Sequence, residues 1–331
     1  MNTLTTDLPS GAHRASTGFV VGIDLGGTKV RAGIADLSGR VLYELTEPTI
    51  DGAGRGLVLQ LSDMVAKLAE AAGATSVDVV ATAIGGAGVA DGDSGRFDRA
   101  PNLGDLAGFS LTTELESALG HPVILENDVN IAALGELHEG AGAKHDSFAF
   151  VSVGTGIGVG LILDGKLWTG ARGGAGEIGY LPLGADPLDP ASHRRGALEE
   201  VVAGDAITGR YTTGSGEPLH NAAAVFDRAE LGDPHATASL DAEARWLAHA
   251  LVAVDAVVNP GLFVLGGGIG TRVELLEPIR DWLVLLGRPD LEVVISSLGS
   301  HAPIVGAVRL AIDTVLRSEE TELTPRERDA S

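Results

Sequence analysis

The sequence predicts an α/β protein of two lobes, each built on a mixed β-sheet, with a cleft between them. Short apolar runs alternate with segments of helical periodicity along most of the 331 residues. A unit of strand, glycine loop, strand, turn and strand occurs at residues 19–46 and again at 148–170. The length also suffices for two domains with a substantial core.

Strands and helices alternate in the first half of the chain. Apolar runs separated by short turns predict strands at residues 18–24, 29–36 and 40–47. Apolar residues at helical spacing, which stop before Gly73, predict a helix at 57–72. The elements expected after this helix are a strand at 77–86, a helix at 111–120, a strand at 122–127 and a helix at 128–140.

The second half begins in the same way as the first. Strands are expected at residues 148–153, 157–164 and 166–170, with a hairpin turn at Asp164-Gly165. Alternating helices and strands follow, and they end in an apolar run that leads into three glycines and in a final helix near 303–316.

These elements divide the chain into two lobes and two tails. We assign residues 18–125 to an N-terminal lobe and 126–302 to a C-terminal lobe, and we expect the final helix to join the first lobe. Residues 1–17 and 318–331 are polar and aperiodic, so we expect them to be disordered tails.

The composition excludes several classes of partner and chemistry. The net charge is −22 and the pI is near 4.6, with no basic stripe to neutralise phosphates, so neither nucleic acid nor an anionic membrane is expected as a partner. The chain has no cysteine, which excludes disulfides, thiol nucleophiles, iron–sulfur clusters and thiolate zinc sites. The N-terminal residues lack the apolar core of a signal peptide, and the most apolar long stretch, Trp246–Leu265, is interrupted by polar residues. We therefore expect a soluble cytoplasmic protein that acts on a small molecule.

Three glycine clusters stand directly after apolar strands. They are Gly26-Gly27-Thr28, which is followed by Lys29, Gly154-Thr155-Gly156, and Gly266-Gly267-Gly268. Glycine lets the backbone turn sharply and lets its N–H groups approach an anion. Any one cluster could equally be an ordinary hairpin turn, but the recurrence favours phosphate binding.

The first cluster resembles a P-loop but does not fit one. Gly22 and Gly27 have the right spacing, whereas Thr28-Lys29 reverses the usual order and a strand follows instead of a helix. The dinucleotide fingerprint fails for the same reason in the first two clusters. The remaining interpretation is a phosphate clamp made of two hairpin loops, one from each lobe.

Asp24 ends the strand that leads into the first cluster. A carboxylate beside phosphates is reasonable when a divalent cation lies between them, so Asp24 is a candidate partner of Mg²⁺, directly or through water. The alternative is an aspartate that only caps a turn.

Asn127 and Asp128 stand where a strand meets a helix, between the two repeated halves. Both residue types are favoured helix N-caps, which is the structural alternative. The functional interpretation is that Asp128 is a general base, which takes a proton from an attacking hydroxyl. A helix N-terminus would keep this carboxylate ionised at neutral pH, at some cost in basicity.

Three further polar residues are weaker candidates. Glu177 lies among glycines, where a hydroxyl-binding role is plausible. By its context alone, Glu199 is a structural acid, because Glu199 and Glu200 begin an amphipathic helix and acids are common there. Asn102 would pass for a loop residue.

Taken together, these segments resemble the ROK family of sugar kinases and repressors, within the actin-like, ribonuclease-H-like ATPase superfamily. The resemblance covers about residues 18–316, and its motifs are GIDLGGTK, PNL, ENDVNIAALGE, GTGIGVGLILDGKLWTGARGGAGEIG and RRGALE, in the family's order. It implies phosphate loops at Asp24–Lys29 and Gly154–Gly156, adenosine beside Gly266–Gly268, and Asp128 as the catalytic base. It also implies that Asn102, Asn127, Glu177 and Glu199 hold sugar hydroxyls, which revises the interpretation of Glu199.

The sequence departs from the family at its zinc site. Family members have a histidine and three cysteines there, and the corresponding residues are Tyr180, Pro190, Ser192 and Ala197. Because all four ligands are replaced, we expect no zinc. The family's histidine also contacts the sugar, so Tyr180 is a candidate substrate-binding residue with a different reach. The family's Pro-Gly pair is here Ala87-Gly88.

The resemblance implies an ATP- and Mg²⁺-dependent kinase that phosphorylates a hexose such as glucose, at the 6-hydroxyl. An amino sugar, as in kanosamine kinases, or a cyclitol is the alternative substrate, and polyphosphate is an alternative donor. A non-catalytic sugar-sensing regulator is the alternative of another class, but only about 18 residues precede the first strand, too few for a DNA-binding domain. A homodimer is expected by analogy with relatives.

Overall fold

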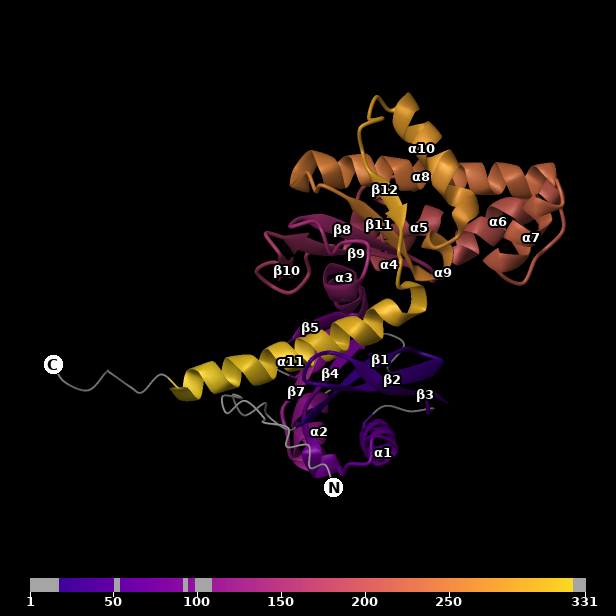
Figure 1. Ribbon diagram of the computed structural model, residues 1–331. Helices are drawn as coiled ribbons and strands as arrows, with labels where there is room; N and C mark the ends of the chain where they lie inside the picture. The colour runs from indigo at the N-terminus through magenta and orange to yellow at the C-terminus, as the bar shows by residue number, and fades with distance from the viewer. Residues whose placement is uncertain (1–17, 51–53, 92–94, 99–108, 324–331) are drawn as a thin grey trace, which may run out of the picture.

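The structure, a computed structural model, describes residues 18–50, 54–91, 95–98 and 109–323. These residues form two lobes, one above the other in Figure 1, with α3 and α11 between their sheets. Asn102, the N-terminal tail and residues beyond 323 lie outside the described part of the chain.

The first lobe contains a five-stranded sheet in the order β3-β2-β1-β4-β7. Its strands are β1 (Phe19–Leu25), β2 (Lys29–Asp36), β3 (Val41–Pro48), β4 (Val79–Gly86) and β7 (Val123–Asn127). β1, β2 and β3 pair antiparallel, whereas β4 and β7 continue parallel to β1. A small separate sheet pairs β5 (Val89–Asp91) with β6 (Arg96–Asp98).

The second lobe repeats this arrangement with the strand order β10-β9-β8-β11-β12. Its strands are β8 (Phe148–Val153), β9 (Ile157–Leu163), β10 (Lys166–Trp168), β11 (Phe263–Gly266) and β12 (Val293–Ile295). The first three pair antiparallel and the last two parallel, as in the first lobe. The predicted duplicated mixed sheet is therefore confirmed.

Alternation along β1 explains how its sheet is covered on both faces. Side chains of successive strand residues point to opposite faces. Val21 and Ile23 pack in one apolar cluster with α1 (Arg55–Ala71) and α2 (Leu111–Leu119), while Val20 packs in another with α11 (Ala302–Leu323). Asp24 is four residues after Val20, so its side chain lies on the same face of the sheet, the face that is turned to the other lobe.

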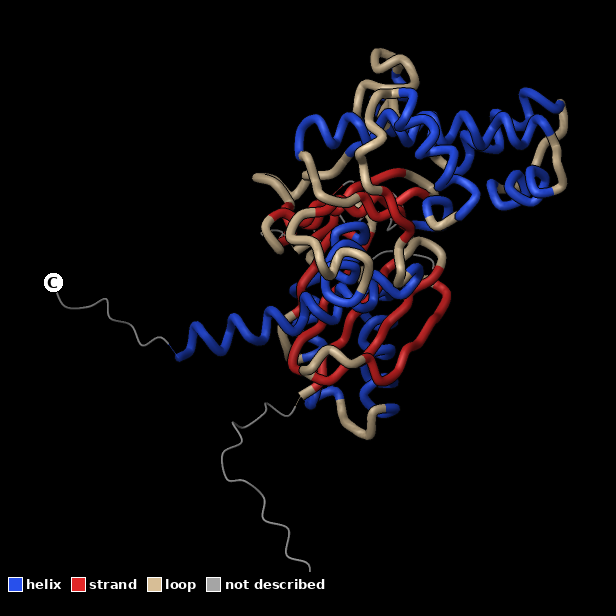
Figure 2. The backbone as a smooth tube through the Cα atoms, turned by 45° about the horizontal axis from the view of Figure 1, so that its top comes forward, coloured by secondary structure: helices blue, strands red, loops and turns tan. Residues whose placement is uncertain are grey.

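Helices α3 (Asp128–Glu139) and α11 cross at very short range. A Cβ added at Gly306 would lie 1.7 Å from the carbonyl oxygen of Ile131, and one at Gly135 would lie 2.2 Å from that of Ala302. Glycine at these positions is what lets the two backbones touch. The helix pair lies between the two sheets, as Figures 1 and 2 show.

The remaining helices pack on the outer face of the second sheet or extend beyond it (Figure 2). They are α4 (Pro190–Arg195), α5 (Glu199–Val202), α6 (Gly204–Ser215), α7 (Ala222–Glu230), α8 (Pro234–Val258), α9 (Gly267–Gly270) and α10 (Leu276–Leu285). Short 3₁₀ turns are η1 (Ser76–Asp78), η3 (Ile178–Tyr180), η4 (Val273–Leu275) and η5 (Gly299–His301). None of the described helices combines the length and apolarity that would let it span a bilayer.

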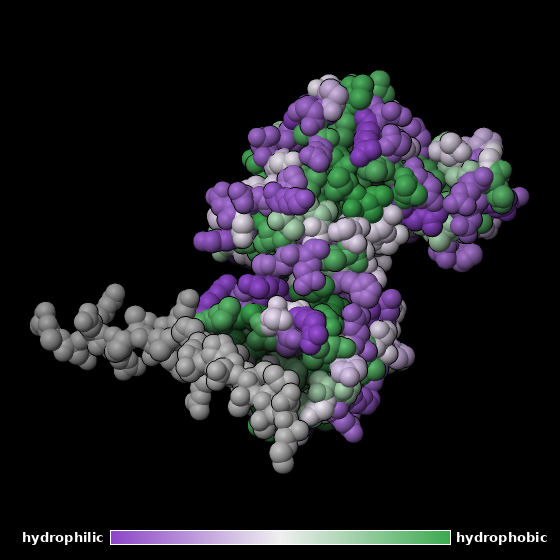
Figure 3. Space-filling model, viewed as in Figure 1, coloured by the Kyte–Doolittle hydropathy of each residue, from purple (hydrophilic) through white to green (hydrophobic). Residues whose placement is uncertain are grey.

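Most boundaries differ from the predicted ones by one or two residues, and the largest difference is at the last helix. The last helix runs to Leu323 instead of 316, so it enters the segment expected to be a tail. Residues 317–323 contain arginine, glutamate and leucine, which favour helix without adding an apolar stripe. The strand expected at 166–170 ends at Trp168. Figure 3 shows hydrophilic side chains on both lobes of the face in view, and a narrowing between the lobes.

Candidate active site

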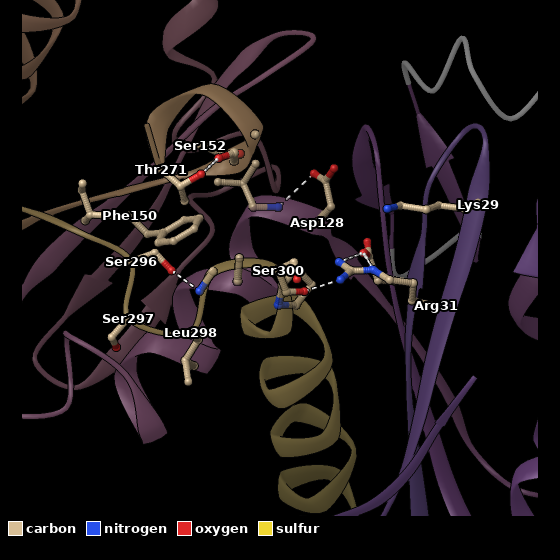
Figure 4. A pocket seen from close by; sticks show the side chains of 18 residues that line it. Lys29, Arg31, Asp128, Phe150, Ser152, Thr271, Ser296, Ser297, Leu298 and Ser300 are labelled. Carbon is tan, nitrogen blue, oxygen red and sulfur yellow. Dashed lines mark hydrogen bonds and ion pairs between the residues drawn. The ribbon is translucent and has the colours of Figure 1, made fainter. Parts of the chain in front are cut away.

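A cavity of about 620 Å³ lies between the lobes. It is lined by the β1–β2 hairpin, the start of α3, β8, α9 and residues 295–303. Its charged residues are Asp24, Lys29, Arg31 and Asp128 (Figure 4). Residues of both lobes therefore line one cavity, although the glycines of the two predicted hairpin loops are not part of its lining.

Asp24 is held by a cross-strand partner. In the antiparallel pairing of β1 and β2, Arg31 stands directly opposite Asp24. The Arg31 Nη2 donates to Asp24 Oδ2 at 2.6 Å and its Nε donates to the same oxygen at 3.2 Å. The Arg31 Nη1 also donates to the carbonyl oxygen of Ser300, in the segment that leads into α11. Asp24 is thus part of a cross-strand ion pair.

Asn127 and Asp128 have different positions at the start of α3. Asn127 is the N-cap: its Oδ1 accepts hydrogen bonds from the backbone N–H groups of Val129 at 2.9 Å and Asn130 at 3.2 Å. Its Nδ2 donates to the carbonyl oxygen of Gly88 at 2.9 Å. The capping alternative thus applies to Asn127, and Asp128, as the first helical residue, is left to line the cavity.

The carboxyl group of Asp128 has a raised pKa. Burial is the main cause, the negative charge of Asp24 adds to it and Glu177 contributes less, and together they raise the pKa to about 6. The hydrogen bond from the Val129 N–H, 2.9 Å long, acts in the opposite direction. The backbone N–H groups of the helix N-terminus thus lower the pKa of Asp128, but burial and the like charge of Asp24 outweigh this effect, so the net shift is upward. The group is still mostly ionised at pH 7.

The first glycine cluster forms the tip of the β1–β2 hairpin. The Gly26 N–H donates to the Lys29 carbonyl at 3.1 Å, and Thr49, just after β3, donates from its side chain to the Gly26 carbonyl at 2.7 Å. Gly27 and Thr28 are exposed at the tip. From the predicted loop, Lys29 reaches the cavity lining together with Asp24.

The second and third clusters lie against each other in the C-terminal lobe. Gly154 bonds back to Gly156 across the β8–β9 turn, at 2.9 Å, and Gly267 has a φ of +77°. A Cβ at Gly267 would lie 2.4 Å from the Val153 carbonyl oxygen. Gly267 and Gly268 line the cavity, whereas Gly154, Thr155, Gly156 and Gly266 are outside its lining.

The side chain of Glu199 lies against the second glycine cluster and forms a hydrogen bond beside it. Its Oε2 accepts from the backbone N–H of Ile157 at 3.1 Å, and a Cβ at Gly156 would lie 2.4 Å from this oxygen. Its Oε1 faces the Nε of Arg195 at 3.4 Å. Arg195 in turn donates to both carboxylate oxygens of Asp205, at 2.7 and 3.0 Å. Glu199 therefore has a structural role at the glycine turn, whatever it does for substrate.

Hydrogen bonds hold together the segment of Tyr180, Pro190, Ser192 and Ala197, which stand at the positions of the expected family zinc ligands. The Tyr180 hydroxyl donates to the Arg194 carbonyl at 3.0 Å, and the Leu198 N–H donates to the Gly179 carbonyl at 3.1 Å. Ser192 and Ala197 are buried, while Tyr180 is half exposed. Glu177 is exposed and lies three residues before Tyr180. Its negative charge contributes to the raised pKa of Asp128.

The donor set is suited to a magnesium ion that is shared with phosphates. Among the described residues no group of three or more His, Asp or Glu side chains is placed to hold a metal. Mg²⁺ commonly keeps several waters and takes one or two carboxylates plus substrate phosphates. Arg31 engages only Oδ2 of Asp24, so Oδ1 is not used by that pair and fits such a ligand.

Two features of the site escaped the sequence prediction. Arg31 would have been found only from the exact strand register that sets it opposite Asp24. The serine-rich stretch Ser296–Ser300 lines the cavity and is held by buried Glu136, which accepts from the Leu298 N–H at 3.2 Å and from the Ser296 hydroxyl. Glu136 lies within a motif quoted above, but nothing in its local pattern indicates a partner so distant in the chain.

Comparisons with known proteins agree with this architecture. The ROK family model matches residues 20–314. The glucokinase of Streptomyces coelicolor is 32% identical, with 89% of this chain and 98% of the relative covered. An N-acetylmannosamine kinase of Yersinia pestis is 34% identical, with 78% of this chain and 85% of the relative covered.

Solved structures give the same picture. The ROK hexokinase from Thermus thermophilus superposes with a TM-score of 0.77 at 33% identity, covering 90% of this chain and 99% of that one. A ROK family glucokinase from Streptomyces griseus, in complex with glucose and AMPPNP, gives a TM-score of 0.73 at 32% identity, covering 89% and 100%.

The duplicated sheets and the charged cavity between them define a two-lobed ATPase of the actin-like fold, which confirms the predicted fold class. Within that class, the chain belongs to the ROK family, as its motifs indicated.

Proposed function

We propose that this protein is an ATP-dependent kinase that transfers the γ-phosphate of ATP to a hydroxyl, the 6-hydroxyl, of a hexose such as glucose. The observation that carries the proposal is Asp128, which lines a cavity between the lobes with Lys29 across from it and glycine-rich α9 beside it (Figure 4). The glucokinase relatives and the glucose–AMPPNP complex of a similar structure support the substrate pair.

In the proposed reaction, Asp128 accepts the proton of the attacking hydroxyl. The hydroxyl oxygen forms a bond to the γ-phosphorus, the bond from that phosphorus to the β–γ bridging oxygen breaks, and ADP leaves. A carboxylate with a pKa of about 6 is mostly deprotonated at pH 7 yet basic enough to hold the proton. Closure of the two lobes around both substrates would lower competition from water.

The phosphates would be bound by the first hairpin (Asp24, Gly26, Gly27, Thr28 and Lys29), the second hairpin (Gly154, Thr155 and Gly156), and Gly266, Gly267 and Gly268 near adenosine. Mg²⁺ held by Asp24, directly or through water, would neutralise charge on the phosphates. Lys29 and the backbone N–H groups of the loops would orient them.

Sugar hydroxyls would contact Glu177, Glu199, Asn127 and Tyr180, and Asn102 from outside the described residues. These residues differ in the contacts that they already make within the protein. Glu177 acts electrostatically on Asp128, whereas Asn127 already bonds to the backbone of its own helix and of Gly88. An amino sugar is the second candidate substrate, favoured by the N-acetylmannosamine kinase relatives.

The test is an ATP-consumption screen over glucose, mannose, N-acetylmannosamine, kanosamine and cyclitols, repeated with polyphosphate as donor. Asp128→Asn should reduce turnover by roughly 10²–10⁴-fold, because it removes the base, and should leave ATP affinity largely unchanged. Full activity of this variant would remove Asp128 from its role. No turnover with any sugar, together with sugar binding, would favour a regulator.

The proposal also covers the zinc content, the oligomeric state and the cellular location of the protein. We expect no stoichiometric zinc in the purified protein, and elemental analysis would decide it. A homodimer in the cytoplasm is the expected state, and sedimentation would measure the assembly.

A further inference from the structure

Glu136 is a fully buried carboxylate that the proposed reaction leaves without a role. It lies near the end of α3, the helix that begins with Asp128, and it contacts the segment 296–300 that lines the cavity. Its hydrogen-bond partners among the described residues are all donors, and none of them is a cation. Burying a carboxylate without an ion pair is costly, so the protein depends on these hydrogen bonds being made.

Each oxygen of Glu136 accepts from one backbone N–H group and one serine hydroxyl. Oε1 accepts from the Leu298 N–H at 3.2 Å and from the Ser296 hydroxyl. Oε2 accepts from the Ala141 N–H at 2.6 Å and from the Ser297 hydroxyl at 3.4 Å. One carboxylate thus joins the end of α3 to a segment that lies 160 residues further along the chain.

The segment 296–300 forms a wall of the cavity beside the third glycine cluster. It follows β12, which pairs parallel to β11, and the Ser296 N–H donates at 2.8 Å to the carbonyl of Leu265, in the strand that leads into that cluster. Its other end contacts the first lobe, where the Ser300 carbonyl accepts from Arg31 (Figure 4). The part of the wall nearest the glycines is therefore the part that the buried carboxylate holds.

We propose that Glu136 is a positioning residue for nucleotide binding: it holds Ser296 and Leu298 against α3 and thereby fixes the cavity wall beside the third glycine cluster. The proposal rests on the proposed function, since it needs a nucleotide in this cavity. The competing interpretation is that Glu136 stabilises the fold and has no effect on binding.

Glu136→Gln tests the proposal because it keeps the shape of the side chain but cannot keep all of its hydrogen bonds. A glutamine amide has one acceptor oxygen and one NH₂ group, and each oxygen of Glu136 faces a backbone N–H that cannot turn. Because the hydrogen bond from Ala141 is the shorter, we expect the amide oxygen to stay there. The NH₂ group then faces the Leu298 N–H and releases the wall.

Calorimetric titration with ADP and steady-state kinetics measure the effect. We expect Glu136→Gln to raise the dissociation constant for ADP and the KM for ATP by roughly 5- to 50-fold, as for a displaced binding wall. The KM for the sugar and kcat should change by less than about 3-fold, because Asp128 keeps its place at the start of α3. A role in stability alone would lower the melting temperature without this difference between the two substrates.

Glu243→Gln is the matched control. Glu243, on α8 of the same lobe, is as fully buried as Glu136, but it pairs with Arg210 at 2.6 Å, away from the cavity lining. We expect its affinity for ADP to be unchanged, whatever its melting temperature. Glu136→Asp serves as the second variant if Glu136→Gln does not fold: it keeps the charge but is shorter by one methylene, so a smaller loss of ADP affinity is expected.

The outcomes separate this inference from the function on which it rests. Unchanged ADP affinity in the folded Glu136 variant, or an equal loss in Glu243→Gln, overturns the role of Glu136 even if the wild-type protein phosphorylates a sugar. Wild-type protein that binds no nucleotide overturns both. A loss of nucleotide affinity that spares the sugar and is absent in Glu243→Gln supports the proposal.

Discussion

At the scale of single residues, Asp128 combines a chemical role with an energetic cost. Its carboxyl group has a pKa of about 6 in the folded protein, above the ordinary value of 3.8. The folded state therefore binds a proton more tightly than the unfolded state does, and the free energy of unfolding falls as the pH rises from about 4 to 6. Ionised Asp128 is thus a source of instability at neutral pH, as is common for residues placed for reactivity.

Asp128→Asn should consequently stabilise the protein at pH 7 to 8. The expected gain is on the order of 1–3 kcal/mol, and it should shrink toward zero near pH 4, because protonated Asp128 already resembles asparagine. Denaturant unfolding at several pH values measures this difference. A gain that does not change with pH would show that the burial of Asp128 charge is not its cause.

The same pKa sets the acidic side of the activity profile. If Asp128 is the base, kcat/KM should decline below a pH of about 6, where the carboxylate of the free enzyme takes up a proton. A rate that is flat down to pH 5 would argue for another base.

Sequence patterns located some of these residues and not others, for a physical reason. Asp24, Lys29 and Asp128 interrupt apolar runs or stand at an element boundary, so their positions at the ends of strands and helices could be predicted. Arg31 could not, because its partner depends on strand register, and a slip of one residue would turn its side chain to the other face. Asn127 shows the reverse case: capping and ligand binding favour the same residue type, so its sequence context left both open.

At the scale of elements, the crossing of α3 and α11 depends on glycine. Gly306→Ala should destabilise the protein by about 1–3 kcal/mol or more, because the new Cβ would lie 1.7 Å from the Ile131 carbonyl oxygen and both helices would have to move apart. Gly209→Ala, at an exposed position of α6, is the control: a Cβ there meets no atom of the described residues within 4 Å. Alanine should stabilise that helix by about 0.5–1 kcal/mol.

Thermal or denaturant unfolding of both variants compares the two sites directly. Equal effects would mean that the crossing is looser than its geometry indicates. Periodicity predicted the existence of both helices, but their crossing at Gly135 and Gly306 needed the fold, because isolated helical glycines look alike in a sequence.

At the scale of the whole molecule, α3 joins the two cores. Ile131 packs with Val20 and Ala83 of the first sheet, whereas Ala133, two residues further on, packs with Phe148 of the second. One helix thus contributes side chains to both lobes. We expect the lobes to unfold in a single transition.

Scanning calorimetry tests this coupling through the agreement of calorimetric and van't Hoff enthalpies. Ile131→Ala, which weakens the shared contact, should broaden or split the transition. Leu61→Ala removes a fully buried side chain within the first lobe alone and should lower the midpoint without splitting it. Two resolved transitions in the wild-type protein would show that the lobes are independent.

The return of α11 to the first lobe has a consequence for synthesis on the ribosome. The apolar face formed by Val20, Ala35, Ala81 and Ala83 is covered by a helix that is translated only after the whole second lobe. A nascent chain that has not yet reached Ala302 therefore presents an open hydrophobic patch on an otherwise finished sheet. Such a chain is a natural client for a holding chaperone, and the last helix is what ends that dependence.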